Sequence, residues 1–299
     1  MSRIIVSVPA TSANLGPGFD SLGIALDLYN KFIFEKKEKF EFINVNEKYA
    51  NENNMIVRSA IDTYKYIGCD VIPFSLEEEQ NIPISRGLGS SATCIVAGIA
   101  AANYFAGNVL TKKDFLKIAT EIEGHPDNVA PAIYGGLISS FVCPNDVEFT
   151  KYDIAESLIF TVAIPNFSLS TAKARGSLPK KLSYSDVVYS LSRAINIPKA
   201  METGDVSRLF LLLNDKLHQP YRLPLINEAL KFRDFSKRNK IPFCISGSGS
   251  TLLFVSDREV ESKLNKMKFK NKWEFKTLKP NLVGFTVEVK DEEWLFNSP

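Results

Sequence analysis

The stretch from Ala92 to Phe105 constrains the fold more than any other part of the chain, because it contains no charged residue. It is rich in Ala, Ile and Val, and its length favours a buried helix over a strand. With 299 residues, of which 45% are hydrophobic, the chain can form a sizeable core around such a helix. The same length favours two domains over one.

The rest of the chain mixes strand-like and helix-like segments without strict alternation. Short apolar or alternating runs predict strands at 4–8, 31–43, 74–84, 137–142, 158–164, 243–245 and 252–255. Amphipathic patterns predict helices at 55–67, 112–122, 126–134, 187–200, 206–213 and 226–238. This mixture predicts an α+β fold. Because the polarity changes around Pro144-Asn145-Asp146, we expect one domain over 1–150 and a second over 151–299.

The segment Gly87-Leu88-Gly89-Ser90-Ser91 stands directly before the uncharged stretch. Its glycines allow positive φ angles and let the backbone come close to a ligand. The amides of a first helical turn have no partner within the helix, and the helix dipole is positive there, so such a helix start binds phosphate. A serine hydroxyl at this point can also bind Mg²⁺ in a nucleotide complex. The segment therefore indicates a phosphate cradle.

Three other interpretations of this segment are possible. The segment is not a Walker loop, because no Gly-Lys-Ser/Thr follows the glycines. Gly87, Gly89 and Ala92 fit the dinucleotide fingerprint, but the preceding strand carries Glu77, Glu78 and Glu79, and Asp114 opens a helix instead of ending a strand. A tight turn with a serine helix cap stays open, because Gly and Ser are common at helix starts.

Two further clusters are candidates for chemistry. Glu121 to Asn128 holds four ionisable groups and an amide, which suits a metal ligand near phosphate, or else a solvated helix end with Asp127 as a cap. The Gly-Ser run at 246–250 is either part of a site or a plain hairpin turn. The other polar candidates are Asn14, Asp20, Thr171, Arg175 and the segment from His218 to Arg222. Pairs of arginines suit carboxylate recognition.

Composition argues against several other classes of protein. The formal net charge is +2, so no global field points to nucleic acid or a membrane as a partner. The Lys-rich segment 263–276 is typical of a solvated surface. The four cysteines are far apart, which argues against a zinc site or a disulfide framework and leads us to expect a reducing, cytoplasmic compartment. Neither a signal peptide nor a membrane-spanning helix is expected.

Taken together, the motifs resemble those of the GHMP kinase superfamily and, within it, the homoserine kinase family. The matching segments are Pro9 to Asp20, Gly87 to Ala92, Glu123 to Pro131 and Leu217 to Arg222. They span both halves of the chain. One departure is Ser250, where the family usually has proline after Gly-Ser-Gly.

The resemblance implies a ribosomal protein S5 domain 2-like N-terminal domain and a ferredoxin-like C-terminal domain, with ATP and homoserine in the cleft between them. Family matches for the substrate are Asn14, Asp20, His125, Asn128, Arg175 and Arg222. Asp20 would pair with the ammonium group and the two arginines with the carboxylate, while Asn128 and Thr171 would lie at the reacting centre. Matches for ATP are Asn54, Arg86, Gly87, Leu88, Gly89, Ser90 and Ser91. Ser91 and Glu121, chosen over Glu123, would bind Mg²⁺.

The implied reaction converts ATP and L-homoserine into ADP and O-phospho-L-homoserine, a step of threonine biosynthesis. Because the amide of Asn128 cannot take a proton at neutral pH, either Asp127 turns inward as a base or the phosphate itself accepts the proton, and we favour the second. Two alternatives are another GHMP small-molecule kinase and a non-catalytic ligand-sensing relative. A homodimer is a further expectation from the family.

Overall fold

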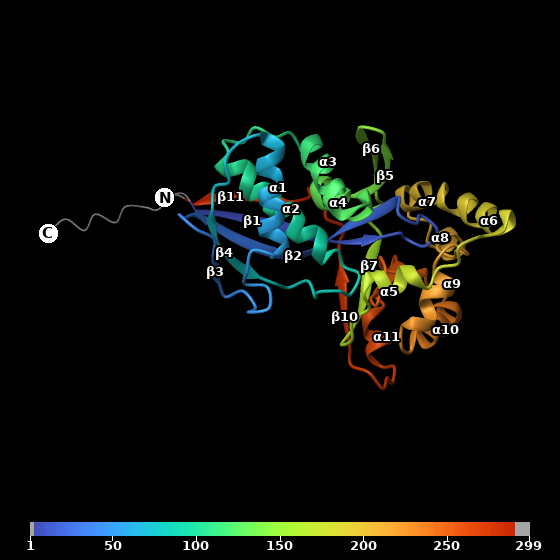
Figure 1. Cartoon of the computed structure of the whole chain (residues 1–299). Helices are drawn as coiled ribbons and strands as arrows, with labels where there is room; N and C mark the ends of the chain where they lie inside the picture. The colour runs from blue at the N-terminus through green and yellow to red at the C-terminus, as the bar shows by residue number, and fades with distance from the viewer. Residues whose placement is uncertain (1–2, 291–299) are drawn as a thin grey trace.

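Two β-sheets organise the chain in a computed structural model that describes residues 3–290 (Figure 1). The first sheet has seven strands in the order β11-β1-β2-β4-β3, and the β5–β6 hairpin extends it from β2. Its strands are β1 (Arg3–Ala13), β2 (Leu22–Lys36), β3 (Glu41–Ile43), β4 (Phe74–Glu79), β5 (Leu137–Cys143), β6 (Asp146–Tyr152) and β11 (Thr286–Lys290). Only the β3–β4 pair within this sheet is parallel among the described residues.

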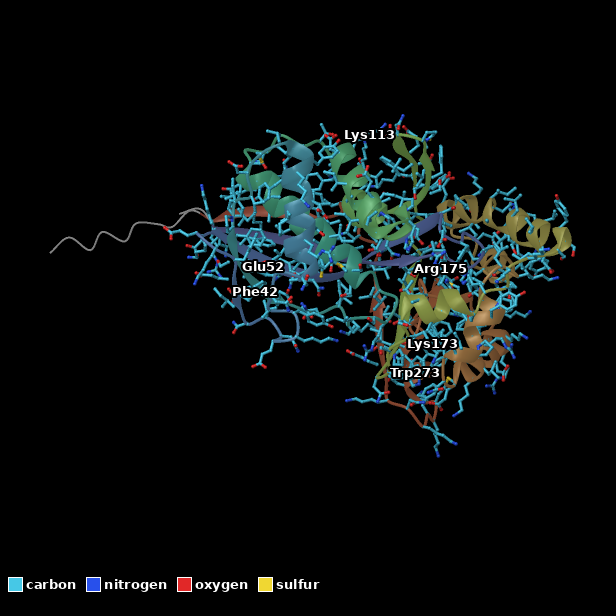
Figure 2. The ribbon with its side chains drawn as sticks, viewed as in Figure 1. Phe42, Glu52, Lys113, Lys173, Arg175 and Trp273 are labelled. Carbon is cyan, nitrogen blue, oxygen red and sulfur yellow. The ribbon has the colours of Figure 1, made fainter. Side chains whose placement is uncertain are left out.

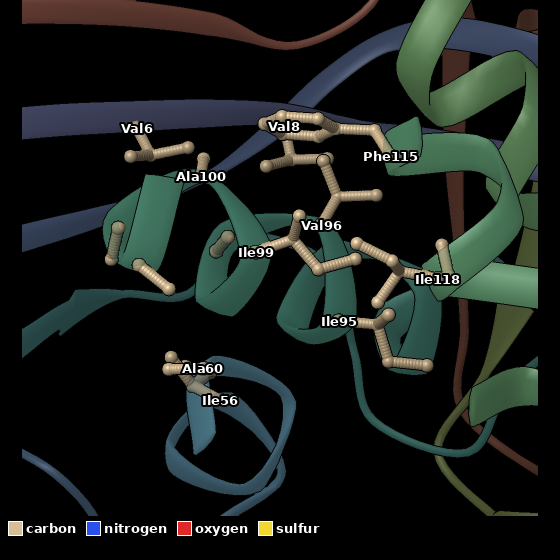
Figure 3. Close-up of a cluster of buried hydrophobic side chains, with 14 of the residues drawn as sticks. Val6, Val8, Ile56, Ala60, Ile95, Val96, Ile99, Ala100, Phe115 and Ile118 are labelled. Carbon is tan, nitrogen blue, oxygen red and sulfur yellow. The ribbon is translucent and has the colours of Figure 1, made fainter. Parts of the chain in front are cut away.

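Four helices accompany this sheet: α1 (Met55–Ile67), α2 (Ser90–Phe105), α3 (Lys112–Glu123) and α4 (Pro126–Tyr134). The prediction of a buried helix in the uncharged stretch is confirmed, because α2 is buried along most of its length. Figure 3 shows α2 between Val8 of β1, Ile56 of α1 and Phe115 of α3. An apolar helix surrounded in this way places its polar N-terminal turn at a fixed point of the fold.

The second sheet has four antiparallel strands in the order β10-β7-β9-β8, which are β10 (Trp273–Leu278), β7 (Ile159–Pro165), β9 (Leu252–Ser256) and β8 (Phe243–Ile245). The elements around it are α5 (Thr171–Gly176), α6 (Tyr184–Ala194), α7 (Ile197–Thr203), α8 (Val206–Leu212), α9 (Gln219–Arg222), the 3-10 turn η1 (Leu223–Leu225), α10 (Ala229–Asn239) and α11 (Glu261–Asn265). Along β9 the side chains alternate between two cores: Leu253 packs with Met201, and Phe254 with Phe232.

The α+β class predicted from the sequence is confirmed, while several element bounds differ. The predicted strand 31–43 is two strands, because the charged turn after Lys36 separates β2 from β3. The predicted helix 187–200 is also interrupted: α6 ends at Ala194, and Pro198, which has no N–H to donate, lies in the first turn of α7. No helix within residues 3–290 is long and apolar enough to cross a membrane.

The polarity change at Pro144 to Asp146 is the turn between β5 and β6. The expected domain division at 150 and 151 therefore falls inside β6, and β11 returns from the C-terminal part of the chain to pair with β1. The division into two domains stays a prediction. The cavity described next is lined by the end of β4 in the first sheet and by loops and helices around the second sheet.

Candidate active site

A cavity of about 350 Å³ lies between the helical layer of the first sheet and the loops of the second. It brings together segments that are far apart in the sequence: the loop after β1, the chain before α1, the end of β4, the starts of α2 and α4, and α5, α9 and the turn at 247–248. The predicted site residues that line it are Asn14, Asp20, Asn54, Arg86, Gly87, Gly89, Ser90, Ser91, His125, Asn128, Thr171, Arg175 and Arg222. Two predicted residues, Leu88 and Glu121, do not.

At Gly87 and Gly89 the backbone approaches its neighbours so closely that no side chain fits. Gly87 and Gly89 have φ angles of 79° and 69°, and a Cβ atom at Gly89 would clash with the hydroxyl of Thr11. A Cβ atom at Gly87 would clash with the carbonyl oxygen of Ser246. Gly89 is the N-cap of α2 and makes no side-chain cap. The structure therefore does not contain the serine-capped turn that the sequence left open.

The carbonyl groups that precede Gly89 are bonded outside the helix that follows. Those of Arg86 and Leu88 accept hydrogen bonds from the amides of Thr251 and Thr11, at 2.9 and 3.2 Å. The first backbone bond of α2 runs from Thr93 to Gly89, at 3.0 Å. The amides between Gly89 and Thr93 consequently have no partner inside the helix, and Ser90 and Ser91 line the cavity, as an anion-binding helix start requires.

Leu88 anchors the segment instead of contacting a ligand. Its side chain is fully buried in the core beneath the second sheet, while its neighbours on both sides line the cavity. The predicted contact of Leu88 with ATP stays a prediction, and it would have to be made by the backbone of Leu88.

Glu123, and not Glu121, lies beside Ser91. The hydroxyl of Ser91 donates a hydrogen bond of 2.7 Å to the Glu123 carboxylate, and burial raises the pKa of Glu123 although this bond opposes the shift. Glu121 is exposed and borders a separate hollow between α1 and α3. Two residues along a helix turn the side chain by about 200°, so only one of the two acids can face α2. The placement of Glu121 with Ser91 is thus wrong.

The start of α4 presents a second group of polar side chains. Asp127 is only 2% exposed, and its carboxylate lies 2.7 Å from Nδ1 of His125. This hydrogen bond raises the pKa of His125, and burial of the ring opposes the shift. Asn128 lines the cavity, and its Oδ1 accepts a hydrogen bond of 2.7 Å from the hydroxyl of Thr11. Its Nδ2 donates a long hydrogen bond of 3.4 Å to Oδ1 of Asp127.

Arg222 is a buried cation without a carboxylate partner. It is 1% exposed, and among residues 3–290 no carboxylate lies within ion-pair distance of it. Its guanidinium makes long hydrogen bonds, 3.3 Å to the carbonyl of Gly247, 3.4 Å to the carbonyl of Ala174 and 3.4 Å to Nδ1 of His218. Burial lowers the pKa of Arg222, and nearby Arg175 adds to the effect. A guanidinium stays charged in proteins, so the site calls for an anion.

Arg175 reaches the same end of the cavity from α5, where α5 approaches the first sheet (Figure 2). It donates two hydrogen bonds, both of 2.9 Å, to the carboxylate of Asp20. The ring of Phe19 contacts both arginines, with its centroid 5.5 Å from the guanidinium carbon of Arg175 and 5.1 Å from that of Arg222. Phe19 was not predicted, and its cation–π contacts keep two like charges in one place.

Asn14 connects the first loop to the Gly-Ser turn. Its side chain donates to the carbonyl of Gly247 at 2.7 Å and accepts from the amide of Asp20 at 2.9 Å. Asn14 is therefore largely committed to holding the loops that carry Asp20. Thr171 lies opposite the same turn, with its hydroxyl 3.3 Å from that of Ser248. The Gly-Ser run is thus part of the cavity wall, in addition to being a turn between β8 and β9.

Asn54 is the N-cap of α1. Its Oδ1 accepts from the amide of Ile56 at 2.8 Å, and its Nδ2 donates to the carbonyl of Tyr49 at 3.0 Å. Sequence reasoning missed the other residues of this end of the cavity, which are Tyr49, Met55, Glu78, Gln80, Ile84 and Cys94. For Glu78 alone the sequence held a signal, because acidic residues break the apolar pattern within the predicted strand 74–84.

Comparison with known proteins agrees with this geometry. Residues 54–136 match the family model described as GHMP kinases N terminal domain. A curated homoserine kinase from Clostridium botulinum is 40% identical over 289 residues, covering 94% of this chain and 97% of that protein. One from Clostridium kluyveri is 38% identical over 297 residues, covering 96% and 99%.

Solved structures give the same result. A homoserine kinase from Cytophaga hutchinsonii superimposes with a TM-score of 0.84 at 25% identity, covering 96% of this chain and 97% of that one. The mevalonate kinase of Methanococcus jannaschii shares the fold, with a TM-score of 0.66 at 16% identity and coverage of 92% and 98%. With 40% identity to a curated relative along nearly its whole length, the chain belongs to the homoserine kinase family.

Proposed function

We propose that this chain transfers the γ-phosphoryl group of ATP to the side-chain hydroxyl of L-homoserine, giving O-phospho-L-homoserine and ADP. The observation that carries the proposal is the buried guanidinium of Arg222, which has no carboxylate partner within residues 3–290, in the same cavity as the open helix start of α2. A guanidinium recognises the carboxylate of an amino acid, and an open helix start recognises phosphate. Asp20, next to both arginines, supplies an acceptor for the ammonium group.

The residues at the helix start suit the electrostatics of phosphoryl transfer. Such a reaction depends mainly on positioning and on neutralising the charge of the transferred group. The free amides of the first turn of α2 serve this purpose without reorganisation. Arg86 is fixed beside them by hydrogen bonds to the carbonyls of Pro165 and Asn166, at 3.0 and 3.1 Å.

Mg²⁺ fits the donor set at the edge of this helix start. A serine hydroxyl and a carboxylate are the hard oxygen ligands that Mg²⁺ takes together with substrate phosphates, and Ser91 and Glu123 already lie within hydrogen-bond distance. No group of three acidic, His or Cys side chains converges within residues 3–290, which agrees with an ion held largely by the nucleotide. When bound, the ion would offset charge on the phosphates. We therefore assign Ser91 and Glu123 as its protein ligands.

No protein base is required for the transfer in our proposal. Asn128 cannot accept a proton at neutral pH, and Asp127 is buried against His125. We propose that Asn128 orients the hydroxyl of homoserine, that Thr171 lies beside the transferred group, and that a phosphate oxygen takes the proton. His125 then contacts the substrate from the start of α4.

Family membership supports several finer assignments. These are an S5 domain 2-like N-terminal domain over 1–150, a ferredoxin-like C-terminal domain over 151–299, an active site in the cleft between them, a role in threonine biosynthesis in the cytoplasm, and a homodimer. The two sheets and the shared cavity support the domain names, with β11 as a C-terminal strand that joins the first sheet.

A coupled assay of ADP release tests the proposal. Homoserine, mevalonate, shikimate and galactose are offered side by side with ATP and Mg²⁺, with a reaction lacking acceptor as the blank. We expect turnover with homoserine alone. Turnover with a different acceptor would identify another kinase of the superfamily, and binding of homoserine without ADP release would identify a non-catalytic relative.

A further inference from the structure

The cavity has a second polar end that the proposed chemistry does not use. It is formed by the chain before α1, the end of β4 and the inner face of α2, whereas the arginines come from α5 and α9. Figure 1 shows α1 and β4 to one side of α2, and α5 and α9 to the other. If the phosphates lie at the start of α2 and homoserine at the arginines, the base of the nucleotide occupies this remaining end.

Glu78 is an acidic side chain at this end of the cavity. It is the last inward-facing residue of β4, following Phe74 and Leu76, which are fully buried. Among residues 3–290 no Lys, Arg or His side chain lies within ion-pair distance of its carboxylate, whereas its neighbours Glu77 and Glu79 pair with Arg3 and Lys31. Burial raises the pKa of Glu78, and hydrogen bonds from Gln80 and Asn54 only partly oppose this.

The hydrogen bonds around Glu78 leave a particular pattern facing the cavity. Nε2 of Gln80 donates a hydrogen bond to Oε2 of Glu78, and Asn54 also hydrogen-bonds to this carboxylate. A carboxylate has about four acceptor positions, so these two bonds leave acceptor capacity open toward the cavity that Glu78 lines. The amide groups of Gln80 and Asn54 supply donors beside it. This end of the cavity therefore offers a hydrogen-bond acceptor, the Glu78 carboxylate, next to amide donors, and not two adjacent acceptors.

This pattern discriminates among purine bases. Adenine presents an amino donor next to a ring-nitrogen acceptor, and guanine presents two adjacent donors or an oxygen acceptor. An open carboxylate acceptor beside an amide donor matches adenine. Guanine and hypoxanthine carry an oxygen at the position of the adenine amino group, and the carboxylate repels that oxygen. Asn54 cannot fill this role alone, because its Oδ1 is already bonded to Ile56.

We propose that Glu78 selects adenine nucleotides by accepting a hydrogen bond from the exocyclic amino group of the base. The proposal rests on the proposed function, because it takes the cavity to be the ATP site. It makes Glu78 a specificity-determining residue, and it assigns Gln80 the task of orienting the carboxylate.

The test compares ATP with ITP, which carries an oxygen where adenine has its amino group, as phosphoryl donors for homoserine. Glu78→Gln is measured against the wild type, and Glu79→Gln serves as the matched control because Glu79 is exposed and on the opposite face of β4. A hydrogen bond to a charged group accounts for about 10- to 100-fold in kcat/KM, so we expect wild type to prefer ATP by that factor. Glu78→Gln should lose most of the preference with the KM for homoserine unchanged, and Glu79→Gln should keep it.

Each outcome distinguishes this proposal from the proposed function. If wild type uses ATP and ITP equally well, Glu78 does not select the base, whatever the variants do. If Glu78→Gln slows ATP and ITP by the same factor, its role is structural and the proposal is overturned. If wild type releases no ADP with homoserine and either nucleotide, the proposed function itself fails.

Discussion

Asp20 and Arg175 are joined by two hydrogen bonds of 2.9 Å, although 155 residues separate them in the chain. The pair combines a carboxylate and a guanidinium, which are the partners that an amino acid zwitterion needs. Arg222, which has no carboxylate partner in the part of the chain that the structure describes, lies close enough to contact the ring of Phe19 together with Arg175. A zwitterion entering the cavity can therefore replace the Asp20–Arg175 pair without leaving either charge unpartnered.

Replacing Asp20 by Asn should weaken the binding of homoserine. The ammonium group loses its carboxylate, and Arg175 loses its resting partner, so we expect the KM for homoserine to rise about 10-fold, a moderate effect because the pair is partly exposed. The KM for ATP should not change. Steady-state kinetics with each substrate varied in turn checks this, and an unchanged KM for homoserine would remove Asp20 from the ammonium site.

Replacing Arg222 by Ala should have a larger effect, because Arg222 is buried. Loss of one partner of a buried charged contact costs roughly 2–5 kcal/mol of binding, so the KM for homoserine should rise by at least about 30-fold. Arg233→Ala, which removes an exposed arginine of α10, is the matched control. Circular dichroism and thermal melting report whether the variant is folded. Unchanged turnover of homoserine would show that Arg222 does not clamp the carboxylate.

Glu123 and Glu121 provide a paired test of the metal assignment. Glu123→Gln should raise the Mg²⁺ concentration for half-maximal activity by about 10-fold or more, because a ligand next to Ser91 is lost. Glu121→Gln should behave like wild type, since its carboxylate borders a different hollow. Isothermal titration of the nucleotide complex with Mg²⁺ provides a second readout. The reverse result would return the metal site to Glu121.

The sequence was informative where one residue type is the only possible solution. Gly87 and Gly89 could be recognised because no side chain fits at their positions, and α2 because its uncharged composition suits only burial. The choice between Glu121 and Glu123 could not be made in this way, since both are acids on one helix and only its rotation against α2 decides which faces Ser91.

Long-range contacts account for the other residues that the sequence did not reveal. Phe19 gains its role from arginines more than 150 positions away, and Glu78 gains its role from the cavity at the end of an ordinary-looking strand. Asn54 lines the cavity, but its side chain caps helix α1. A family motif does not distinguish such a capping role from contact with a ligand. Such roles depend on packing between elements, which no short motif encodes.

Replacing Asp127 by Asn tests whether a protein base is needed. If a phosphate oxygen accepts the proton, kcat should fall by less than the factor of about 10²–10⁴ that a general base contributes. Some loss is expected, because Asp127 orients His125 through their 2.7 Å contact. A fall in kcat within that range, with the KM for homoserine unchanged, would instead make Asp127 the base.

Glu228 should make stability depend on pH, well away from the cavity. Its carboxylate accepts hydrogen bonds of 2.9 Å from the amides of Lys270 and Asn271, and it pairs with Lys231 at 2.8 Å. Burial opposes the charged form, but the hydrogen bonds outweigh it and lower the pKa of Glu228 to about 2. A lowered pKa stabilises the fold above the unfolded value of about 4.3, and this contribution is lost as the pH falls towards 2.

Glu228→Gln should therefore reduce the free energy of unfolding by about 1–3 kcal/mol at pH 7, as expected for hydrogen bonds to a charged group. The difference from wild type should shrink steadily between pH 4 and pH 2, because the wild-type carboxylate becomes protonated there. Urea unfolding at pH 7, 4 and 3 measures it, with Glu202→Gln, which breaks the exposed pair with Lys199, as a control near zero. A difference that stays constant across this range would mean that Glu228 acts through packing and not through its charge.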